Sequence, residues 1–340
     1  MTNEELKQTI KEIVTVGKGI LAADESVKTA TKRLVAINTE STEETRRQYR
    51  NMILTSPGIE KYILGVILFE ETLSQKSNDG VLFPEFLAKL GIVPGIKVDK
   101  GLEDINDKDE QITTKGLEGL GERLEEYKKM GCRFAKWRVV YLISKNTPSD
   151  EIIEINAQDL ARYAKVCQEH GIVPIIEPEV LIDGTHSIDK SEEVNEKVLI
   201  KVFEALEEEE VDIKTLILKT SMIISGNQAN NRASVDEVAK RTAQLLKKVV
   251  PPELPSINFL SGGQTPLEAT AHLNRIHTLG KEFPWNVSFS YARALQGPAL
   301  KVWQGKDENL LAAQKAFIFR AKLNSLATKG KYKEEMEEEV

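Results

Sequence analysis

One lysine in this chain of 340 residues lies in an unusual place. Lys219 falls within residues 215–222, TLILKTSM, an apolar run typical of a buried strand. A charged ammonium group is costly to bury, and burial lowers the pKa of a lysine so that part of it becomes free amine. A free amine in a dry pocket is the nucleophile of Schiff-base chemistry. Taken alone, such a lysine is also compatible with a salt bridge or a strand end that reaches solvent.

Seven further apolar runs share this strand-like character, and helical periodicity appears between them. The eight runs are residues 19–24, 62–70, 91–99, 134–141, 173–180, 215–222, 256–262 and 286–293. Residues 160–167 have helical spacing before Gly171, and Ser41 begins a pattern typical of a capping box that opens a helix through Met52. Eight strands alternating with helices predict an α/β fold, a single closed (β/α)8 TIM barrel. We expect residues 1–330 to form this domain.

Polar residues stand late in most of the runs. The active site of such a barrel lies at the carboxyl ends of its strands, so these residues are expected on one rim. Residues i and i+2 of a strand share a face, which pairs Lys136 with Arg138 and Glu177 with Glu179. Structural ion pairs are the alternative for any one residue, but the whole set on one rim indicates a site. The set is Asp24, Ser26, Lys97, Asp99, Lys136, Arg138, Glu177, Glu179, Lys219, Ser261, Ser290 and Arg293.

The residue types suggest a separate chemical role for each residue around Lys219. Lys136, if adjacent, favours the free amine by like-charge repulsion. Glu177 and Glu179 can supply a proton donor and a partner that holds the lysines. Asp24 is suited to taking a proton from a substrate hydroxyl.

Two groups of residues are suited to binding anions. Ser261-Gly262-Gly263 offers backbone N–H groups after the seventh run, where this fold often binds phosphate, and Arg293 after the eighth can clamp the same group. A second basic group, Lys32, Arg33 and Lys97, lies nearer the first run. Two anion sites flanking an amine predict a substrate with a phosphate at each end and a carbonyl between.

Composition excludes several other classes of function. A net charge of −7 and a pI of about 5.5 argue against a nucleic-acid or anionic-membrane surface. Two cysteines without metal spacing, no signal peptide and no membrane-length run predict a cytoplasmic protein. The four histidines have no zinc spacing, and His272 and His277 are expected on the surface of a helix, so no metal is predicted. The acidic tail, residues 331–340, is expected to be solvated and flexible.

Seven motifs in order resemble the class I fructose-1,6-bisphosphate aldolases, the metal-free Schiff-base type. The resemblance covers almost the whole chain, from about residue 3 to about residue 332. The motifs are GKGILAADES (17–26), PGIKVDKG (94–101), FAKWR (134–138), GIVPIIEPE (171–179), LILK (216–219), FLSGGQ (259–264) and FSYARALQ (289–296).

The resemblance implies an enzyme that cleaves fructose 1,6-bisphosphate without a cofactor, and a tetramer. It implies that Lys219 forms the Schiff base and that Glu177, with Glu179 beside it, is the acid/base that dehydrates the carbinolamine. Asp24 and Lys136 match residues that act when the carbon–carbon bond breaks. The residues expected to bind the substrate or its phosphates are Ser26, Thr29, Arg33, Lys97, Arg138, Ser261, Gly262, Gly263, Ser290 and Arg293.

Three departures from the family's pattern bear on function. Animal members end in a tyrosine that helps to move the enamine proton, whereas this chain has no tyrosine after Tyr332. Ala292 stands where the family usually has glycine, so we expect the nearby phosphate to be more tightly constrained. Val27-Lys28-Thr29 replaces the common Thr-Gly-Ser and adds a positive charge that we expect to affect substrate preference.

Two alternatives fit part of the pattern. A transaldolase-like barrel enzyme would also use a lysine, but it would not need two phosphate sites. A non-catalytic scaffold could keep the fold and bind other proteins, but it would be free to lose Lys219 or Glu177, and this chain keeps both.

Overall fold

Eight parallel strands close into a barrel in the computed structural model, which describes residues 2–104, 111–279 and 282–338. Around the barrel the order is β1-β10-β9-β8-β7-β6-β3-β2, with β1 paired to both β10 and β2. The predicted (β/α)8 barrel is therefore confirmed. The barrel strands are β1 (Gly19–Ala23), β2 (Ile63–Leu68), β3 (Val93–Lys97), β6 (Phe134–Tyr141), β7 (Val173–Val180), β8 (Ile217–Thr220), β9 (Ser256–Phe259) and β10 (Asn286–Tyr291).

Each predicted run contains one barrel strand, but several strands end before the run does. The run at 286–293 contains β10 and then the first residue of α11, so Arg293 opens a helix instead of ending a strand. A short antiparallel hairpin, β4 (Leu102–Asp104) with β5 (Ile112–Thr114), was not predicted. It lies in the connection between β3 and β6.

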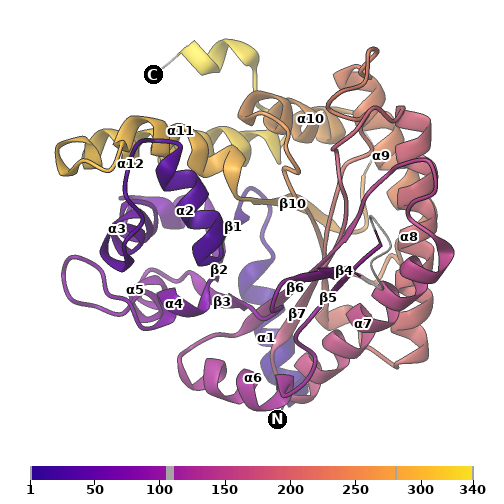
Figure 1. Cartoon of the computed structure of the whole chain (residues 1–340), viewed down its shortest axis with the longest axis horizontal. Coiled ribbons are helices and arrows are strands. Elements are labelled where there is room, and N and C mark those ends of the chain that lie inside the picture. The colour runs from indigo at the N-terminus through magenta and orange to yellow at the C-terminus, as the bar shows by residue number, and fades with distance from the viewer. Residues whose placement is uncertain (1, 105–110, 280–281, 339–340) are drawn as a thin grey trace.

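Helices surround the strands, with α7, α8 and α9 on one side and α2, α3, α11 and α12 on another (Figure 1). The α-helices are α1 (Thr2–Ile13), α2 (Val27–Val35), α3 (Glu43–Leu54), α4 (Glu70–Leu73), α5 (Phe83–Lys89), α6 (Leu120–Lys129), α7 (Asp150–Glu169), α8 (Ile188–Glu208), α9 (Val235–Val249), α10 (Pro266–Thr278), α11 (Arg293–Trp303) and α12 (Leu310–Ala327). Single 3-10 turns are η1 (Ile59–Lys61), η2 (Ile213–Thr215), η3 (Asp307–Asn309) and η4 (Glu334–Glu338). None of the helices in the described ranges has the length and hydropathy that a membrane crossing requires.

Local chemistry sets the helix ends. The helix predicted from Ser41 starts one residue later than expected, because Thr42 is the N-cap of α3 and exchanges hydrogen bonds with Thr45. The helix stop predicted at Gly171 is confirmed, since α7 ends at Glu169 and Gly171 has φ +69°.

The inside of the barrel has a separate apolar layer at the amino ends of its strands. Phe134, Val173 and Ile217 are the first residues of β6, β7 and β8, and their side chains are buried together. Glycine makes room for the largest of them, because a Cβ at Gly95 would lie 2.2 Å from the Phe134 ring. Helix α1 covers this end of the barrel and buries Leu6 against the layer (Figure 1). Catalytic side chains therefore have to come from the other end.

The acidic tail contacts the helices around the barrel at more than one described residue, and the Tyr332 backbone N–H donates to Asn274 Oδ1 of α10 at 3.0 Å. Glu337 in η4 forms an ion pair with buried Arg320 of α12 and accepts a hydrogen bond from Tyr332 Oη at 3.0 Å. Arg320 also donates to the backbone oxygen of Pro266, the first residue of α10. The predicted flexibility of residues 331–340 stays a prediction, and residues 339–340 lie outside the described residues.

Candidate active site

Three neighbouring strands place the central side chains directly above the apolar layer. Because alternate residues of a strand share a face, the inward positions that follow the apolar layer are Lys136, Glu177 and Lys219. All three side chains are buried. The strand register brings Glu177 beside Arg138 and Lys219 beside Asn258. The lysine singled out by the sequence is thus inside the barrel, at the carboxyl end of β8.

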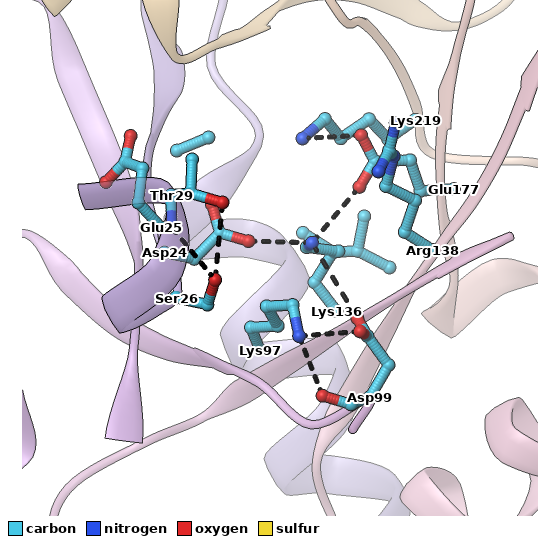
Figure 2. A network of polar contacts seen from close by, with 12 residues as sticks. Asp24, Glu25, Ser26, Thr29, Lys97, Asp99, Lys136, Arg138, Glu177 and Lys219 are labelled. Atoms are coloured by element: carbon cyan, nitrogen blue, oxygen red, sulfur yellow. Dashed lines mark hydrogen bonds and ion pairs between the residues drawn. The ribbon is translucent and has the colours of Figure 1, made fainter. Parts of the chain in front are cut away.

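Glu177 connects the two buried lysines. Lys219 Nζ lies 2.9 Å from Glu177 Oε1, and Lys136 Nζ lies 3.3 Å from Glu177 Oε2. Lys136 Nζ also lies 2.7 Å from Asp24 Oδ2, at the end of β1, and 3.9 Å from Asp99 Oδ2. Figure 2 shows Lys136 at the centre of this network, with Asp24, Glu177 and Asp99 around it. The predicted catalytic residues Lys219, Glu177, Lys136 and Asp24 therefore lie together.

Charge pairing outweighs burial in setting the protonation states of this network. Burial alone would raise the pKa of Asp24, but Lys136, Lys219 and Lys97 hold it well below the usual range. Burial alone would lower the pKa of Lys136, but Asp24, Glu177 and Asp99 raise it. The pKa of Glu177 is also lowered, because Lys219 and Lys136 outweigh its burial. The resting site thus holds two carboxylates and a charged Lys136 at neutral pH.

Glu179 has a different partner from Glu177. Its Oε2 accepts a hydrogen bond from Arg138 Nε, and no contact with Lys136 or Lys219 is found in the described residues. Burial would lower the pKa of Arg138, but the charges of Glu179 and Glu177 raise it. The prediction of one carboxylate that holds the lysines fits Glu177 alone, and Glu179 instead orients Arg138.

A cavity of about 1120 Å³ opens over this network at the carboxyl ends of the strands. One end is formed by the loop after β9 and the start of α11, where Ser261, Gly262, Ser290 and Arg293 line the wall. Ser290 Oγ is buried and has no hydrogen-bond partner among the described residues. A bound anion can therefore satisfy Ser290 together with Arg293 and the backbone of the glycine loop.

Comparisons with known proteins agree over nearly the whole chain. The family model described as glycolytic, fructose-bisphosphate aldolase class-I, matches residues 5–340. A probable fructose-bisphosphate aldolase class 1 of Xanthomonas campestris is 50% identical over 98% of this chain and 100% of its own length. Fructose-bisphosphate aldolase 4, cytosolic, of Arabidopsis thaliana is 49% identical over 94% of this chain and 82% of its own length. The chain belongs to the class I fructose-bisphosphate aldolase family.

A solved structure supports the same conclusion for the fold. Fructose-bisphosphate aldolase from Plasmodium falciparum, crystallised in a ternary complex with TRAP and a small-molecule inhibitor, superposes with a TM-score of 0.95 and 48% identity. The alignment covers 98% of this chain and 96% of that one. The family match decides against the transaldolase-like alternative.

Most residues predicted to bind substrate in this aldolase line the cavity, but several are already engaged. Gly263 is not part of the cavity wall, although a Cβ there would lie 3.7 Å from Arg293 Nη2. Lys97 Nζ lies 2.6 Å from Asp99 Oδ1. Ser26 caps α2 by accepting a hydrogen bond from the Thr29 backbone N–H at 3.3 Å. The residues that do line the wall are Asp24, Ser26, Thr29, Arg33, Lys97, Lys136, Arg138, Glu177, Glu179, Lys219, Ser261, Gly262, Ser290 and Arg293.

Arg33 was expected near the second phosphate, but its guanidinium belongs to a buried network. Arg33 pairs with Glu25, which also pairs with Arg50 of α3 at 2.5 Å. Arg33 Nη1 further donates to Tyr49 Oη at 2.9 Å and to Gln296 Oε1 of α11 at 3.1 Å. This network ties α2, α3 and α11 together, and two of its members, Glu25 and Arg33, line the cavity wall. It was missed because Glu25, Tyr49 and Gln296 lie far apart in sequence.

The structure bears on two further expectations. Ala292 has φ −106°, outside the positive range that favours glycine, and the expected tighter constraint on the phosphate stays a prediction. His272 lies on α10, but it is buried and not on the surface, with Nδ1 2.7 Å from Gln264 Oε1. Burial lowers the pKa of His272 to about 4. Within the described residues, no group of three or more His, Cys, Asp or Glu side chains is placed to hold a metal ion.

Proposed function

We propose that the chain reversibly cleaves fructose 1,6-bisphosphate to dihydroxyacetone phosphate and glyceraldehyde 3-phosphate through an imine on Lys219. The observation that carries the assignment is the 2.9 Å contact between Lys219 Nζ and Glu177 Oε1 inside the cavity. This contact gives the amine an acid/base partner in the position that imine formation requires.

Imine formation uses Glu177 twice. Glu177 accepts the proton that the Lys219 ammonium must lose, and the free amine attacks the C2 carbonyl of the substrate. A proton then moves from the nitrogen to the C2 oxygen, which gives the neutral carbinolamine. Protonated Glu177 donates its proton to the resulting C2 hydroxyl, which leaves as water. The products are the iminium on Lys219 and the Glu177 carboxylate.

Carbon–carbon cleavage uses the other half of the network. Asp24 takes the proton of the C4 hydroxyl while the C3–C4 bond breaks, and the electron pair moves into the iminium to give an enamine. Lys136, 2.7 Å from Asp24 Oδ2, stabilises negative charge on the C4 oxygen as the aldehyde forms. Protonation of the enamine at C3 and hydrolysis of the iminium then release dihydroxyacetone phosphate.

Tyr332, the last tyrosine of the printed sequence, does not line the cavity in which the enamine would form. Its side chain is buried and bonded to Glu337. We therefore expect slow enamine turnover. Exchange of the C3 proton of dihydroxyacetone phosphate, compared with the rate of cleavage, measures this step, and exchange much faster than cleavage contradicts the expectation.

The assignment is tested by trapping the imine. Borohydride reduction with fructose 1,6-bisphosphate or dihydroxyacetone phosphate, followed by peptide mass mapping, is expected to find the adduct on Lys219, with equal yield in EDTA. No adduct in folded protein would favour a non-catalytic scaffold. An adduct on Lys136 or Lys97 would show that the nucleophile is assigned wrongly.

We also propose a cytoplasmic homotetramer whose catalytic domain spans residues 1–330. Buried, free Cys132 and Cys167 suit a reducing compartment, and the Arabidopsis relative is named cytosolic. Light scattering after size-exclusion chromatography measures the oligomeric state, and a monomer or dimer mass would contradict the tetramer.

A further inference from the structure

Strand β7 is paired to different extents with its two neighbours. On one side, β6 and β7 pair over the full length of both strands. On the other side, the ladder between β7 and β8 covers two pairs in the described part of the chain, and it ends with Ile176 beside Leu218. Glu177 and Lys219 are the next residues on the two strands. The contact between the proposed acid/base and the proposed nucleophile therefore lies just beyond the end of the ladder (Figure 2).

A proline explains why the ladder ends there. The Val173 N–H donates to the backbone oxygen of Arg133 at 3.0 Å, on the β6 side of β7. Backbone N–H groups point alternately to the two neighbours along a strand, so the even-numbered positions of β7 face β8. Pro178 occupies one of these positions and has no N–H to donate. Val180 is the next residue of β7 that can donate toward β8.

The Ser221 side chain supplies the next connection between β7 and the end of β8. Its hydroxyl accepts a hydrogen bond from the Val180 N–H at 3.1 Å and donates one to the Val180 backbone oxygen at 3.0 Å. One hydroxyl can do both, because it carries an O–H donor and two lone pairs. Ser221 and Val180 are both buried, so loss of the hydroxyl would leave a buried N–H unpaired. The hydroxyl thus takes the place of the ladder that Pro178 interrupts.

The reacting pair lies between two fixed points on these strands. The last ladder pair comes one residue before Glu177 and Lys219, and the Ser221 contact comes two residues after Lys219. Lys219 Nζ lies 2.9 Å from Glu177 Oε1, which is within the range for direct proton transfer. A misplacement of about 1 Å can lower a rate by about 10²-fold. Separation of the two strands beyond the ladder would therefore slow imine formation.

The segment after Ser221 has separate anchors to the surrounding helices. The Ile223 N–H donates to Thr242 Oγ1 of α9 at 2.9 Å, and the Ile224 N–H donates to Ser191 Oγ of α8 at 3.3 Å. These two hydroxyls hold the segment to helices, whereas Ser221 holds one strand to another. They allow the same kind of hydrogen bond to be removed from this segment without changing the contact between β7 and β8.

We propose that Ser221 is a positioning residue for imine formation. Its hydroxyl fixes the carboxyl end of β8 against β7 and so keeps Lys219 Nζ within proton-transfer distance of Glu177. Ser221 is not part of the cavity wall, so it acts through the strands and not on the substrate. The inference rests on the proposed function, in which the imine forms on Lys219.

The test measures imine formation separately from substrate binding. In Ser221→Ala, the rate at which dihydroxyacetone phosphate gives a borohydride-trapped adduct in a single turnover should fall about 10- to 100-fold. A hexitol 1,6-bisphosphate has both phosphates and no carbonyl, so its inhibition constant should stay within about threefold of the wild-type value. Ser221→Thr keeps the hydroxyl and should restore the rate of adduct formation to within about threefold. Ser221→Cys, which has similar size but forms weak hydrogen bonds, makes the same comparison if the alanine variant does not fold.

Ser191→Ala is the matched control, because it removes a buried hydroxyl that anchors the same segment to a helix. Its rate of adduct formation should stay within about threefold of wild type. Exchange of the Val180 amide hydrogen should be faster in Ser221→Ala and unchanged in Ser191→Ala, because the control keeps the contact between the strands. Thermal unfolding shows that both variants are compared in the folded state. Equal slowing of adduct formation in the two alanine variants, or a wild-type rate in folded Ser221→Ala, would overturn the proposal.

The wild-type protein separates this inference from the proposed function. If the wild type gives no borohydride adduct on Lys219, the proposed function fails. If the wild type gives the adduct and Ser221→Ala forms it at the same rate, only the positioning role of Ser221 fails.

Discussion

The two layers inside the barrel come from the same strands and have opposite character. On β6, Phe134 belongs to the apolar layer, and Lys136, two residues later, belongs to the charged network. On β8, Ile217 and Lys219 repeat the pattern. Helix α1 covers the apolar end, and the cavity opens over the charged end. Two residues along a strand therefore separate the side chains that stabilise the barrel from those that take part in the reaction.

The layers also differ in how they contribute to the free energy of unfolding. Buried apolar area in the lower layer stabilises by about 25 cal/mol per Å². Buried ion pairs in the upper layer recover little more than their desolvation, and apolar replacements of such pairs are often neutral or stabilising. Substitutions in the charged layer should therefore lower activity with little change in stability. Substitutions in the apolar layer should lower the free energy of unfolding with little change in activity.

Lys219→Met should show the largest difference between its effect on activity and its effect on stability. It removes the nucleophile while keeping the length of the side chain, so we expect kcat to fall by about 10⁴-fold or more. The midpoint of thermal unfolding should change little, because the buried Glu177 carboxylate keeps Lys136 as a charged partner at 3.3 Å. Cleavage assays and calorimetry measure both, and a severe loss of stability would show that the charged network holds the barrel together.

Glu177→Gln should reduce activity by about 10²- to 10⁴-fold, as for loss of a general acid–base group. Formation of the borohydride-trapped imine should slow in parallel, since Glu177 contacts Lys219 directly. Glu179→Gln is the matched comparison, because Glu179 contacts Arg138 instead. Equal losses of imine formation in the two variants would contradict the separate roles of these carboxylates.

Leu6→Ala tests the apolar layer from the helix that covers it. The side chain is 4% exposed, and its truncation should lower the free energy of unfolding by about 2–5 kcal/mol. At a temperature where the variant stays folded, kcat should remain within about threefold, because Leu6 packs in the apolar layer and not in the cavity wall. Urea unfolding and cleavage assays measure the two quantities. Lys11→Ala, exposed on the same helix, serves as the control, with an expected change within about 0.5 kcal/mol.

Asp24 should contribute less to the free energy of unfolding than Leu6 does, and its contribution should depend on pH. Its pKa is lowered in the folded state, so as pH falls the unfolded chain binds a proton first. The stabilisation is therefore present above the unfolded pKa of about 4 and is lost as pH falls toward the folded value. Asp24→Asn should lose less stability between about pH 5 and pH 3 than the wild type does, by on the order of 1 kcal/mol. Denaturant unfolding across this range measures the difference, and identical pH dependence in both proteins would contradict the assigned shift.

The sequence predicts the strands and the central residues because both depend on local patterns. Each buried run marks a strand, and two-residue spacing places Lys136 and Glu177 inside the barrel. Which partner each side chain contacts depends on residues distant in sequence, and the sequence pattern could not predict it. Examples are the hydrogen bond from Arg33 to Gln296 and the burial of His272. A pattern of charged residues shows which side chains can bind phosphate, whereas the structure shows which of them are still free to do so.

Closure of the barrel has a consequence for how the protein is made. Ile20 in β1 pairs with Ser290 in β10. Strand β1 is synthesised first, and it cannot form this pairing until β10, the last barrel strand, has been synthesised. At about 5–20 residues per second, that interval is on the order of 10–50 s. During it, the edge of β1 and the apolar face of α1 lack part of their covering surface. A chaperone that shields apolar nascent segments would therefore raise the yield of active enzyme most if it acts before β10 is synthesised.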